Sequence, residues 1–149
     1  MLKLGMTELQ KSIIIGTVLG DSYLSKGPSN ARLQIKQSDR YKEYVFWLYE
    51  NIKDICPGKP KQRKDNKQWY INSSGKEELN ELRGLFYARG RKRIPSNIER
   101  LLSSPVSLAV WFMDDGTLDY RKKDHCAFHL CTNCFTKTET KILIETLDA

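Results

Sequence analysis

The sequence has no long apolar run, few cysteines and no recognisable targeting segment. Its longest apolar stretch, residues 13–19, is interrupted by Gly16, whereas a transmembrane helix needs about 20 predominantly apolar residues. The first ten residues, MLKLGMTELQ, lack both the apolar core of a signal peptide and the Arg- and Ser-rich composition of a transit peptide. Four unevenly spaced cysteines are too few for a secreted disulfide framework. We therefore expect a protein that folds inside a cell or organelle and does not span a membrane.

The length and composition are those of a small globular protein. The chain has 149 residues, of which 40% are apolar and 10% aromatic. This is enough for a hydrophobic core in one domain, or in two very small domains that share a core. Low-complexity tracts and long linkers are absent from the sequence. Wholesale disorder is thereby excluded.

The positive charge is concentrated in the first two thirds of the chain. The net charge is +7, but residues 1–104 hold 20 Lys and Arg against 11 Asp and Glu, whereas residues 105–149 hold 5 against 7. The surplus lies mainly in residues 59–67 (KPKQRKDNK) and 89–93 (RGRKR). Basic clusters beside aromatic residues favour a polyanionic partner, of which nucleic acid is the commonest. The alternative is a basic loop that is merely solvated.

The pattern along the chain predicts a mixed α/β fold with too few strands for a doubly wound sheet. Residues 31–37 alternate, with Leu33 and Ile35 on one face, and residues 59–74 are typical of a hairpin that turns at Asp65-Asn66. A further strand is expected over residues 127–132. Helices are expected over residues 13–24 after a cap at Thr7 or Ser12, 41–55 after a cap at Asp39, 76–86, 96–102, 107–114 and from Thr136 onward.

In the helix over residues 41–55, we expect Tyr44, Trp47, Leu48 and Ile52 to form the buried side.

Two segments share an unusual pattern, a short apolar helix that ends in a carboxylate followed by a small residue. They are residues 14–22 (IIGTVLGDS) and 108–116 (LAVWFMDDG). Helices that are apolar nearly all round need burial on every side. Gly16 and Gly20 lie four residues apart and leave a flat strip where another backbone can approach closely. If the two helices pack side by side, Asp21 and Asp115 meet at one end of the pair.

Two carboxylates gathered at one point require a cation, because repulsion and desolvation otherwise cost free energy. Oxygen ligands without histidine favour Mg²⁺. A magnesium site beside a basic surface of strands indicates phosphodiester hydrolysis. The alternative is a pair of core helices with ordinary C-terminal aspartates, although an acid at a helix C-terminus opposes the helix dipole.

These two segments resemble the paired motifs of the LAGLIDADG homing endonucleases. The similarity is to the two-motif, single-chain, I-SceI-like type encoded by mobile group I introns. It covers most of the chain, including residues 20–25 (GDSYLS), the stretch RKRIPSNIERLLSSPVSLAVWFMDDGTLDY and residues 130–136 (LCTNCFT). The resemblance implies an α/β fold built from pseudo-symmetric αββαββα repeats, whose antiparallel sheets bind DNA.

The resemblance also implies a mechanism and a set of catalytic residues. The motif helices would form the interface between the repeats, with Asp21 and Asp115 binding catalytic Mg²⁺ and each serving the cut in one strand. The backbone carbonyls of Gly20 and Asp114 are implied as further metal ligands. Lys92, in the sequence KRIP, corresponds to a basic residue near the metals, or alternatively to one more phosphate contact. The implied function is site-specific double-strand DNA cleavage with a staggered cut; the alternative is an intron RNA maturase or a nucleic-acid-binding module without cleavage.

The implied partner is double-stranded DNA held in the major groove by a saddle of strands, with intron RNA as partner under the alternative function. A complete two-repeat protein is expected to be a monomer that works in a mitochondrion, a chloroplast or a bacterial or phage-infected cytoplasm. Long polar side chains on the expected outer faces are suited to phosphate and base contacts. The candidates are Arg32, Gln34, Lys36, Lys61, Arg63, Lys64, Tyr70 and Asn72 in the first part and His129 and Asn133 in the second.

A cluster of cysteines and histidines offers a competing hypothesis. Residues 125–134 contain two histidines and three cysteines, and the CTNC sequence has the spacing of a zinc knuckle. In a strand, however, alternation places Cys126 on the face opposite His129 and Cys131. This argues against a structural zinc site.

The second repeat is expected to be incomplete. Asp21 and Asp115 are 94 residues apart, but only 34 residues follow Asp115, so a symmetric repeat would need about 60 more, the difference between 94 and 34. We expect residues 1–104 to form the first repeat and residues 105–149 the beginning of a truncated second one, which leaves the activity of this chain open. Because Val110 and Asp114 stand opposite Gly16 and Gly20, the helix packing is expected to be asymmetric.

Overall fold

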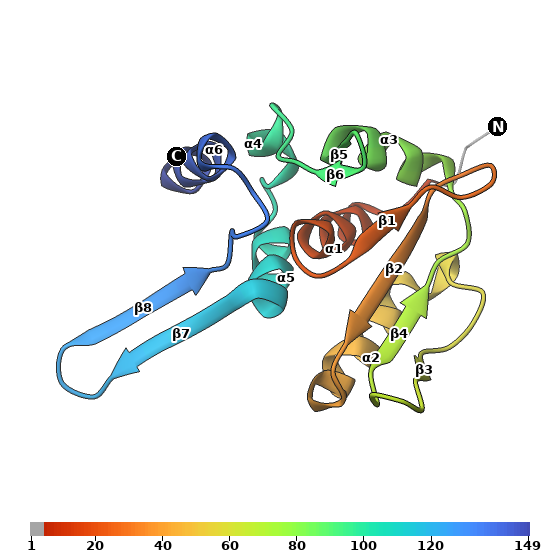
Figure 1. The fold of residues 1–149 in the computed structure, drawn as a ribbon, viewed down its shortest axis with the longest axis horizontal. Coiled ribbons are helices and arrows are strands. Elements are labelled where there is room, and N and C mark those ends of the chain that lie inside the picture. Colours follow the sequence, from red (N-terminus) through yellow and green to blue (C-terminus); the bar gives the residue numbers. More distant parts are fainter. Residues whose placement is uncertain (1–4) are drawn as a thin grey trace.

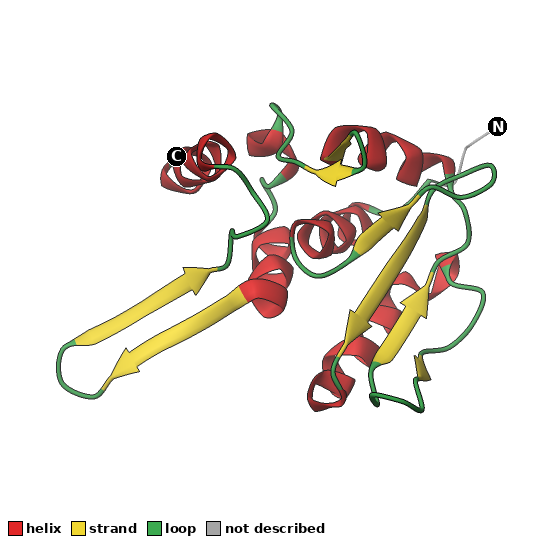
Figure 2. Cartoon of the chain, viewed as in Figure 1, coloured by secondary structure: helices red, strands yellow, loops and turns green. Residues whose placement is uncertain are grey.

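The computed structural model describes residues 5–149 as a mixture of helices and antiparallel strands (Figures 1 and 2). In chain order the elements are α1 (Glu8–Leu19), β1 (Tyr23–Ser25), β2 (Arg32–Gln37), α2 (Lys42–Ile52), β3 (Lys61–Gln62), β4 (Trp69–Asn72), α3 (Glu77–Phe86), β5 (Tyr87–Ala88), β6 (Arg91–Lys92), α4 (Ile98–Leu101), α5 (Pro105–Asp115), β7 (Gly116–Arg121), β8 (His125–Leu130) and α6 (Lys137–Asp148). Short 3-10 turns at Asp39–Tyr41 and Lys53–Ile55 flank α2. In the described part of the chain, none of the helices is both long and apolar enough to cross a membrane.

The first sheet has the strand order β1-β2-β4-β3, and all its pairs are antiparallel. As expected from their alternation, Leu33 and Ile35 are buried, and Ile71 on β4 joins them. Helix α2 covers this apolar face (Figure 1). The opposite face carries the polar side chains and remains open, so the hydrophobic alternation of β2 sets which side of the sheet is free to bind a partner.

Helix α1 begins as predicted but ends earlier. Thr7 forms a capping box with Gln10, whereas Ser12 lies inside the helix. The prediction that the helix runs to residue 24 is wrong: it ends at Leu19, and Leu24 pairs with Leu33 in the sheet. The apolar pattern continues past the end of the helix because Leu24 is buried as part of strand β1, and apolar periodicity alone does not separate the two cases.

The predicted buried side of helix α2 is correct for Leu48 and Ile52 but wrong for Trp47. Val45, Leu48 and Ile52 are buried, whereas Trp47 is 47% exposed and the Tyr44 hydroxyl points toward α5. Asp39 does not cap this helix; its carboxylate accepts a hydrogen bond of 2.7 Å from the indole N–H of Trp69. The helix instead starts from a 3-10 turn.

The later elements were predicted in part. The helices α3, α4, α5 and α6 lie within about three residues of their predicted ranges, and Thr136 caps α6 with a capping box. Strands β5, β6 and β7 were not predicted. The first two pair with each other, and β7 pairs with β8, which overlaps the predicted strand. The β5–β6 hairpin turns at Arg89 and Gly90, which both have positive φ, as a two-residue turn between twisted strands requires.

The two motif helices cross at the centre of the molecule. Helix α1 is buried on every side between residues 13 and 19, as predicted. The same expectation is wrong for α5, because only Ser107, Val110 and Trp111 are buried and Met113 is 51% exposed. The β7–β8 hairpin extends away from the body as a separate two-stranded sheet (Figure 2).

We expect Gly16→Ala to destabilise the protein and Gly84→Ala to stabilise it. Both glycines lie inside helices, so the gain in helix propensity is the same, about 0.5–1 kcal/mol. A Cβ at Gly16 would lie 2.5 Å from the carbonyl oxygen of Ser107, whereas nothing lies within 4 Å of a Cβ at Gly84. Overpacking typically costs about 1–3 kcal/mol. Denaturant unfolding of the two variants measures the difference, and equal stabilisation of both would contradict the close helix contact.

Candidate active site

The close contact between α1 and α5 places the two motif acids side by side. The Cβ of an alanine at Gly16 would meet Val110, and one at Gly20 would overlap Asp114, so each glycine faces a larger residue of α5 as the sequence predicted. The Ser107 hydroxyl donates a 2.8 Å hydrogen bond to the carbonyl of Ser12 across the same interface. Asp21 and Asp115 follow directly at the ends of these helices.

The carboxyl groups of Asp21 and Asp115 interact directly. Burial raises the pKa of Asp115 above its ordinary value, and hydrogen bonding with Asp21 and the negative charges of Asp21 and Asp114 raise it further. Lys92 opposes this shift. The Gln37 amide donates to Asp21 Oδ2 at 3.1 Å and fixes its orientation. Burial and mutual repulsion disfavour ionisation of these two carboxyl groups, and a bound cation would favour it.

Asp114 has a different role from its neighbour because its carboxylate is enclosed by donors. Oδ2 accepts from the Thr17 hydroxyl at 2.8 Å and from the Asp21 backbone N–H at 3.0 Å. Oδ1 accepts from the Tyr44 hydroxyl at 2.8 Å and from the Gln37 amide at 3.4 Å. Burial raises the pKa of Asp114 to about 6, although these hydrogen bonds partly offset it. The side chain therefore ties the end of α1 to α5 and α2, and only its backbone carbonyl remains a candidate metal ligand.

The same environment acts on Tyr44. Burial, together with the charge and hydrogen bond of Asp114, raises the pKa of this phenol well above its ordinary value. Tyr44 therefore stays a neutral donor to Asp114.

Lys92 lies beside the acids, as the sequence predicted, and is held there by backbone carbonyls. Its ammonium group donates to the carbonyl of Gly20 at 3.1 Å and to that of Ser22 at 2.9 Å. Burial lowers the pKa of Lys92, and the negative charges of Asp115 and Asp21 counteract this effect. The Gly20 carbonyl, a predicted metal ligand, accepts this hydrogen bond with one lone pair and keeps the other for a cation.

Three residues that hold the acids in place were not predicted from the sequence, namely Thr17, Gln37 and Tyr44. Gln37 lies on the same side of β2 as Leu33 and Ile35 and is 8% exposed. The sequence did contain a signal for Gln37, because this polar residue occupies the next inward-facing position after Leu33 and Ile35. Tyr44 was predicted to be part of an apolar stripe, and nothing in the sequence indicated that its hydroxyl would reach Asp114.

The open face of the first sheet carries most of the predicted DNA contacts. Directly paired residues of an antiparallel sheet point to the same side, so the register Gln34↔Asn72 and Lys36↔Tyr70 aligns these side chains, with Lys61 opposite Tyr70. Arg32 lies on the same side of β2. Tyr23 pairs with Gln34, is 46% exposed and belongs to this face although it was not predicted.

Four other predicted contacts lie outside that sheet. Arg63 and Lys64 are in the loop after β3, where Arg63 forms a two-point ion pair with Asp65 at 3.0 and 2.8 Å. His129 is an exposed residue of β8, whereas Asn133 lies in a turn beyond that strand. Arg63 interacts electrostatically with Tyr70 on the polar face, whereas His129 and Asn133 lie on and beyond β8, which belongs to a different sheet.

The zinc alternative is not supported by the arrangement of the cysteines. All four are free, and Cys126, Cys131 and Cys134 are exposed. In the described residues 5–149, no cysteine belongs to a group of three or more side chains placed to share a metal ion.

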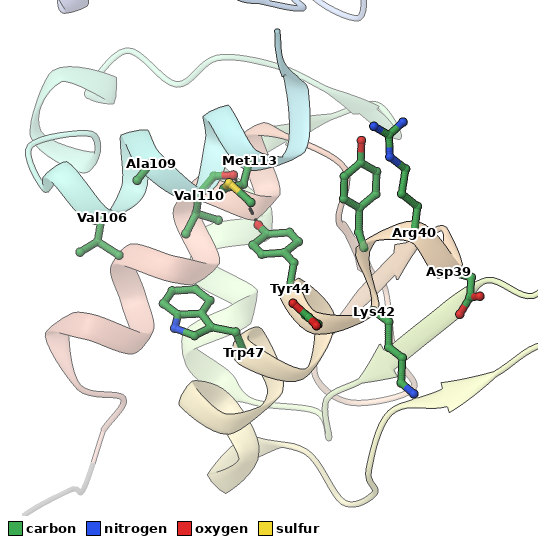
Figure 3. Close-up of a pocket in the computed structure, with 11 residues that line it drawn as sticks. Asp39, Arg40, Lys42, Tyr44, Trp47, Val106, Ala109, Val110 and Met113 are labelled. Atoms are coloured by element: carbon green, nitrogen blue, oxygen red, sulfur yellow. Dashed lines mark hydrogen bonds between the residues drawn. The ribbon is translucent and has the colours of Figure 1, made fainter. Parts of the chain in front are cut away.

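A large groove lies next to the acids but does not contain them. It has a volume of about 810 Å³ and separates α2 from α5 (Figure 3). Trp47 lines it on the α2 side, and Val106, Ala109 and Met113 line it on the α5 side. Tyr44 connects the two regions, since it lines the groove and its hydroxyl bonds to Asp114.

Comparisons with known proteins find relatives along most of the chain. The sequence model of the LAGLIDADG DNA endonuclease family matches residues 11–149. DNA endonuclease I-ChuI of Chlamydomonas applanata is 26% identical over 92% of this chain and 70% of its own length. Cytochrome b mRNA maturase bI2 of Debaryomyces hansenii is 30% identical over 91% of this chain and 54% of its own. The structure of homing endonuclease I-WcaI bound to its DNA recognition sequence superposes with a TM-score of 0.81 at 27% identity, covering 96% of this chain and 67% of that one.

We expect Asp115→Asn to stabilise the protein at alkaline pH when divalent cations are removed by EDTA. Because the folded-state pKa of Asp115 is raised, the folded protein holds its proton more tightly than the unfolded chain. Its contribution to stability is therefore lost as pH rises through the folded pKa. Asparagine carries no charge, so the variant should exceed the parent by on the order of 1 kcal/mol at pH 8, with a smaller gap at pH 5. Thermal unfolding measures this.

Asp124→Asn, a change of an exposed acid in the β7–β8 turn, is the matched control and should produce no such pH-dependent gap. A variant Asp115→Asn that is less stable than the parent at pH 8 would contradict the close pairing of the acids.

Proposed function

The chain belongs to the LAGLIDADG DNA endonuclease family, and from this premise we propose that it cuts double-stranded DNA at a specific site and leaves a staggered break. The predictions of the family, of its mixed α/β fold and of an endodeoxyribonuclease are confirmed at the level of the family. Placement in the I-SceI-like subgroup stays a prediction. The observation that carries the proposal is the pair of acids at the crossing of α1 and α5.

We propose Mg²⁺ as the metal that this site uses. The donor set fits, because Asp21 and Asp115 supply carboxylate oxygens, and burial together with the neighbouring acids raises the pKa of Asp115. The backbone carbonyls of Gly20 and Asp114 would complete the protein's share of the ligands. When bound, Mg²⁺ would supply activation of water and stabilisation of the leaving oxygen in phosphodiester hydrolysis.

The chain's own residues position these acids and balance their charge. Gln37 bonds to both Asp21 and Asp114, so that the sheet and both motif helices share one hydrogen-bonded network. Lys92 adds a cation beside the acids, where it counters the charge that develops on a cleaved phosphate. One acid comes from each motif, which supports one acid serving each strand and hence a staggered cut.

The open face of the first sheet is proposed to bind the DNA. Its aligned rows combine bidentate readers such as Arg32 and Gln34 with the phosphate-binding lysines Lys36 and Lys61. Support comes from I-WcaI, whose structure is described as bound to its DNA recognition sequence.

We propose residues 1–104 and 105–149 as the two units of the saddle, the second incomplete, and a monomer as the state of a complete protein. The chain spans 54–70% of the length of the three relatives compared above. The activity, substrate and assembly of the whole protein are therefore part of the proposal.

A second candidate function is assistance in the splicing of an intron RNA. It is favoured by the 30% identity to a protein named a cytochrome b mRNA maturase. The two functions make different demands on the acids, since binding and folding an RNA does not require a pair of metal-binding carboxylates.

We expect Asp21→Asn and Asp115→Asn each to abolish one strand cut while leaving affinity for DNA within a few fold. The acids are placed to hold the metal, whereas the sheet supplies most of the binding. The assay scores nicked and linear forms of a plasmid that carries the intron-less host gene, in Mg²⁺ and in EDTA, and measures binding separately. Asp148→Asn, at the exposed end of α6, is the control and should cut like the parent.

Persistence of Mg²⁺-dependent cutting in the double variant would overturn the assignment of the acids. Splicing of the host intron that survives in that same double variant, together with no cutting by the parent, would favour the maturase function.

We expect Lys36→Ala and Lys61→Ala each to flatten the salt dependence of DNA binding. Each phosphate contact contributes about 0.9 to the slope of log affinity against log salt concentration. Binding to a mixed-sequence duplex at several salt concentrations gives this slope. Lys53→Ala is the matched control, because Lys53 pairs with Glu50 at the end of α2, which covers the other face of the sheet. Unchanged slopes for Lys36→Ala and Lys61→Ala would mean that this face does not contact DNA.

A further inference from the structure

The β7–β8 hairpin gathers three side chains that suit a metal ion and that take no part in the proposed cleavage site. They are Asp119 on β7 and His125 and His129 on β8. Their potential ligand atoms all lie within 4.8 Å of one another. The sequence contains two histidines, and both belong to this group.

The strand register explains why these three residues meet. Asp119 pairs with Ala127, which lies midway between His125 and His129 on β8. Alternate residues of a strand share a face, so both histidines flank the position opposite Asp119. Because Ala127 has only a methyl group, the space between the two imidazoles stays open.

The carboxylate of Asp119 is already oriented toward one histidine. Its Oδ2 lies 3.6 Å from Nε2 of His125, and its Oδ1 lies 3.6 Å from Nε of Arg121. A second partner on a ligating carboxylate is the usual arrangement at metal sites, where it holds the ligand in place.

We propose that Asp119, His125 and His129 form a binding site for one divalent transition-metal ion of the zinc class. Metal–ligand bonds of about 2.0–2.1 Å place neighbouring ligands of a tetrahedral ion about 3.3 Å apart. The three side chains must close from their present separations of up to 4.8 Å, and both imidazoles are exposed. The site is distinct from the acid pair, which offers no imidazole.

The ligand chemistry decides between the two kinds of metal. Two imidazole nitrogens and one carboxylate suit Zn²⁺, Co²⁺ or Ni²⁺, whereas Mg²⁺ prefers oxygen ligands alone. Three protein ligands leave at least one coordination position for water or an outside oxygen. The hairpin site is therefore expected to take up transition metals under conditions in which the acid pair takes up magnesium.

The position of this site relates it to the proposed DNA surface. Thr117 lies two residues after Asp115 and pairs with His129 on β8. In the same way, Tyr23 lies two residues after Asp21 and pairs with Gln34 on β2. Tyr23 and Gln34 lie on the open face of the first sheet, so the metal site occupies the equivalent face of the second hairpin. An ion there would offer its open position to a phosphate oxygen, a consequence that rests on the proposed function, whereas the metal site itself does not.

Titration of the full chain with Co²⁺ tests the site without DNA. Visible spectra report the coordination number, and calorimetry gives affinity and stoichiometry. With excess Mg²⁺ present to occupy the acid pair, we expect one cobalt ion per chain, lost or weakened at least about tenfold in His125→Ala and in His129→Ala, since even supporting residues around a metal contribute that much. Asp124→Asn is the matched control, because this exposed acid adjoins His125 but is not in the group.

Two further variants separate the competing sites. Binding should persist in a protein with Cys126, Cys131 and Cys134 all changed to Ser, with no thiolate-to-cobalt charge-transfer band in the parent. It should also persist in Asp21→Asn/Asp115→Asn, whatever the effect of that change on DNA cutting. Absence of binding in the parent, undiminished binding in His125→Ala/His129→Ala, or loss in the cysteine variant would each overturn the proposal.

Discussion

The close approach of α1 and α5 is the constraint on which the rest of the structure depends. Gly16 and Gly20 remove the side chains that would separate the two backbones, and Val110 and Asp114 fill the space that this leaves. Larger residues on both helices would push the acids apart. The position of each motif acid is therefore set by packing at the residue just before it, Gly20 or Asp114, and more than a turn earlier, at Gly16 or Val110.

Asp114 converts this packing contact into a fixed geometry. Burying a carboxylate costs free energy unless its oxygens accept hydrogen bonds. Here three side chains, one each from α1, β2 and α2, and the backbone N–H of Asp21 donate them. Asp114 and Asp115 are adjacent in sequence but differ in function. The first is a structural anchor whose two oxygens accept hydrogen bonds, whereas the second faces Asp21, and burial and the neighbouring acids raise its pKa.

The two hairpins that follow the motif acids, β1–β2 and β7–β8, carry different kinds of side chain on their outer faces. In the first sheet, the outer face is built from long polar and basic side chains, and α2 covers the inner face. In the second hairpin, the outer face carries an aspartate and both histidines, and the inner face leaves Phe128 70% exposed. Equivalent register therefore gives equivalent position but not equivalent ligands, because position comes from the backbone and chemistry from the side chains.

The sequence by itself determined the family, the two motif helices, the alternation of β2 and the meeting of Asp21 with Asp115, because these follow from local periodicity and from glycine spacing. It also placed Lys92 near the acids through its resemblance. It did not reveal β7, the exposure of Trp47 on α2 or the end of α1; at the end of α1 the apolar run is compatible with either strand or helix. Only the tertiary structure joined Gln37, Tyr44 and Asp114, and only the cross-strand register joined Asp119 to the two histidines. Hydrogen bonds between residues distant in sequence depend on how whole elements are placed, which no local pattern specifies.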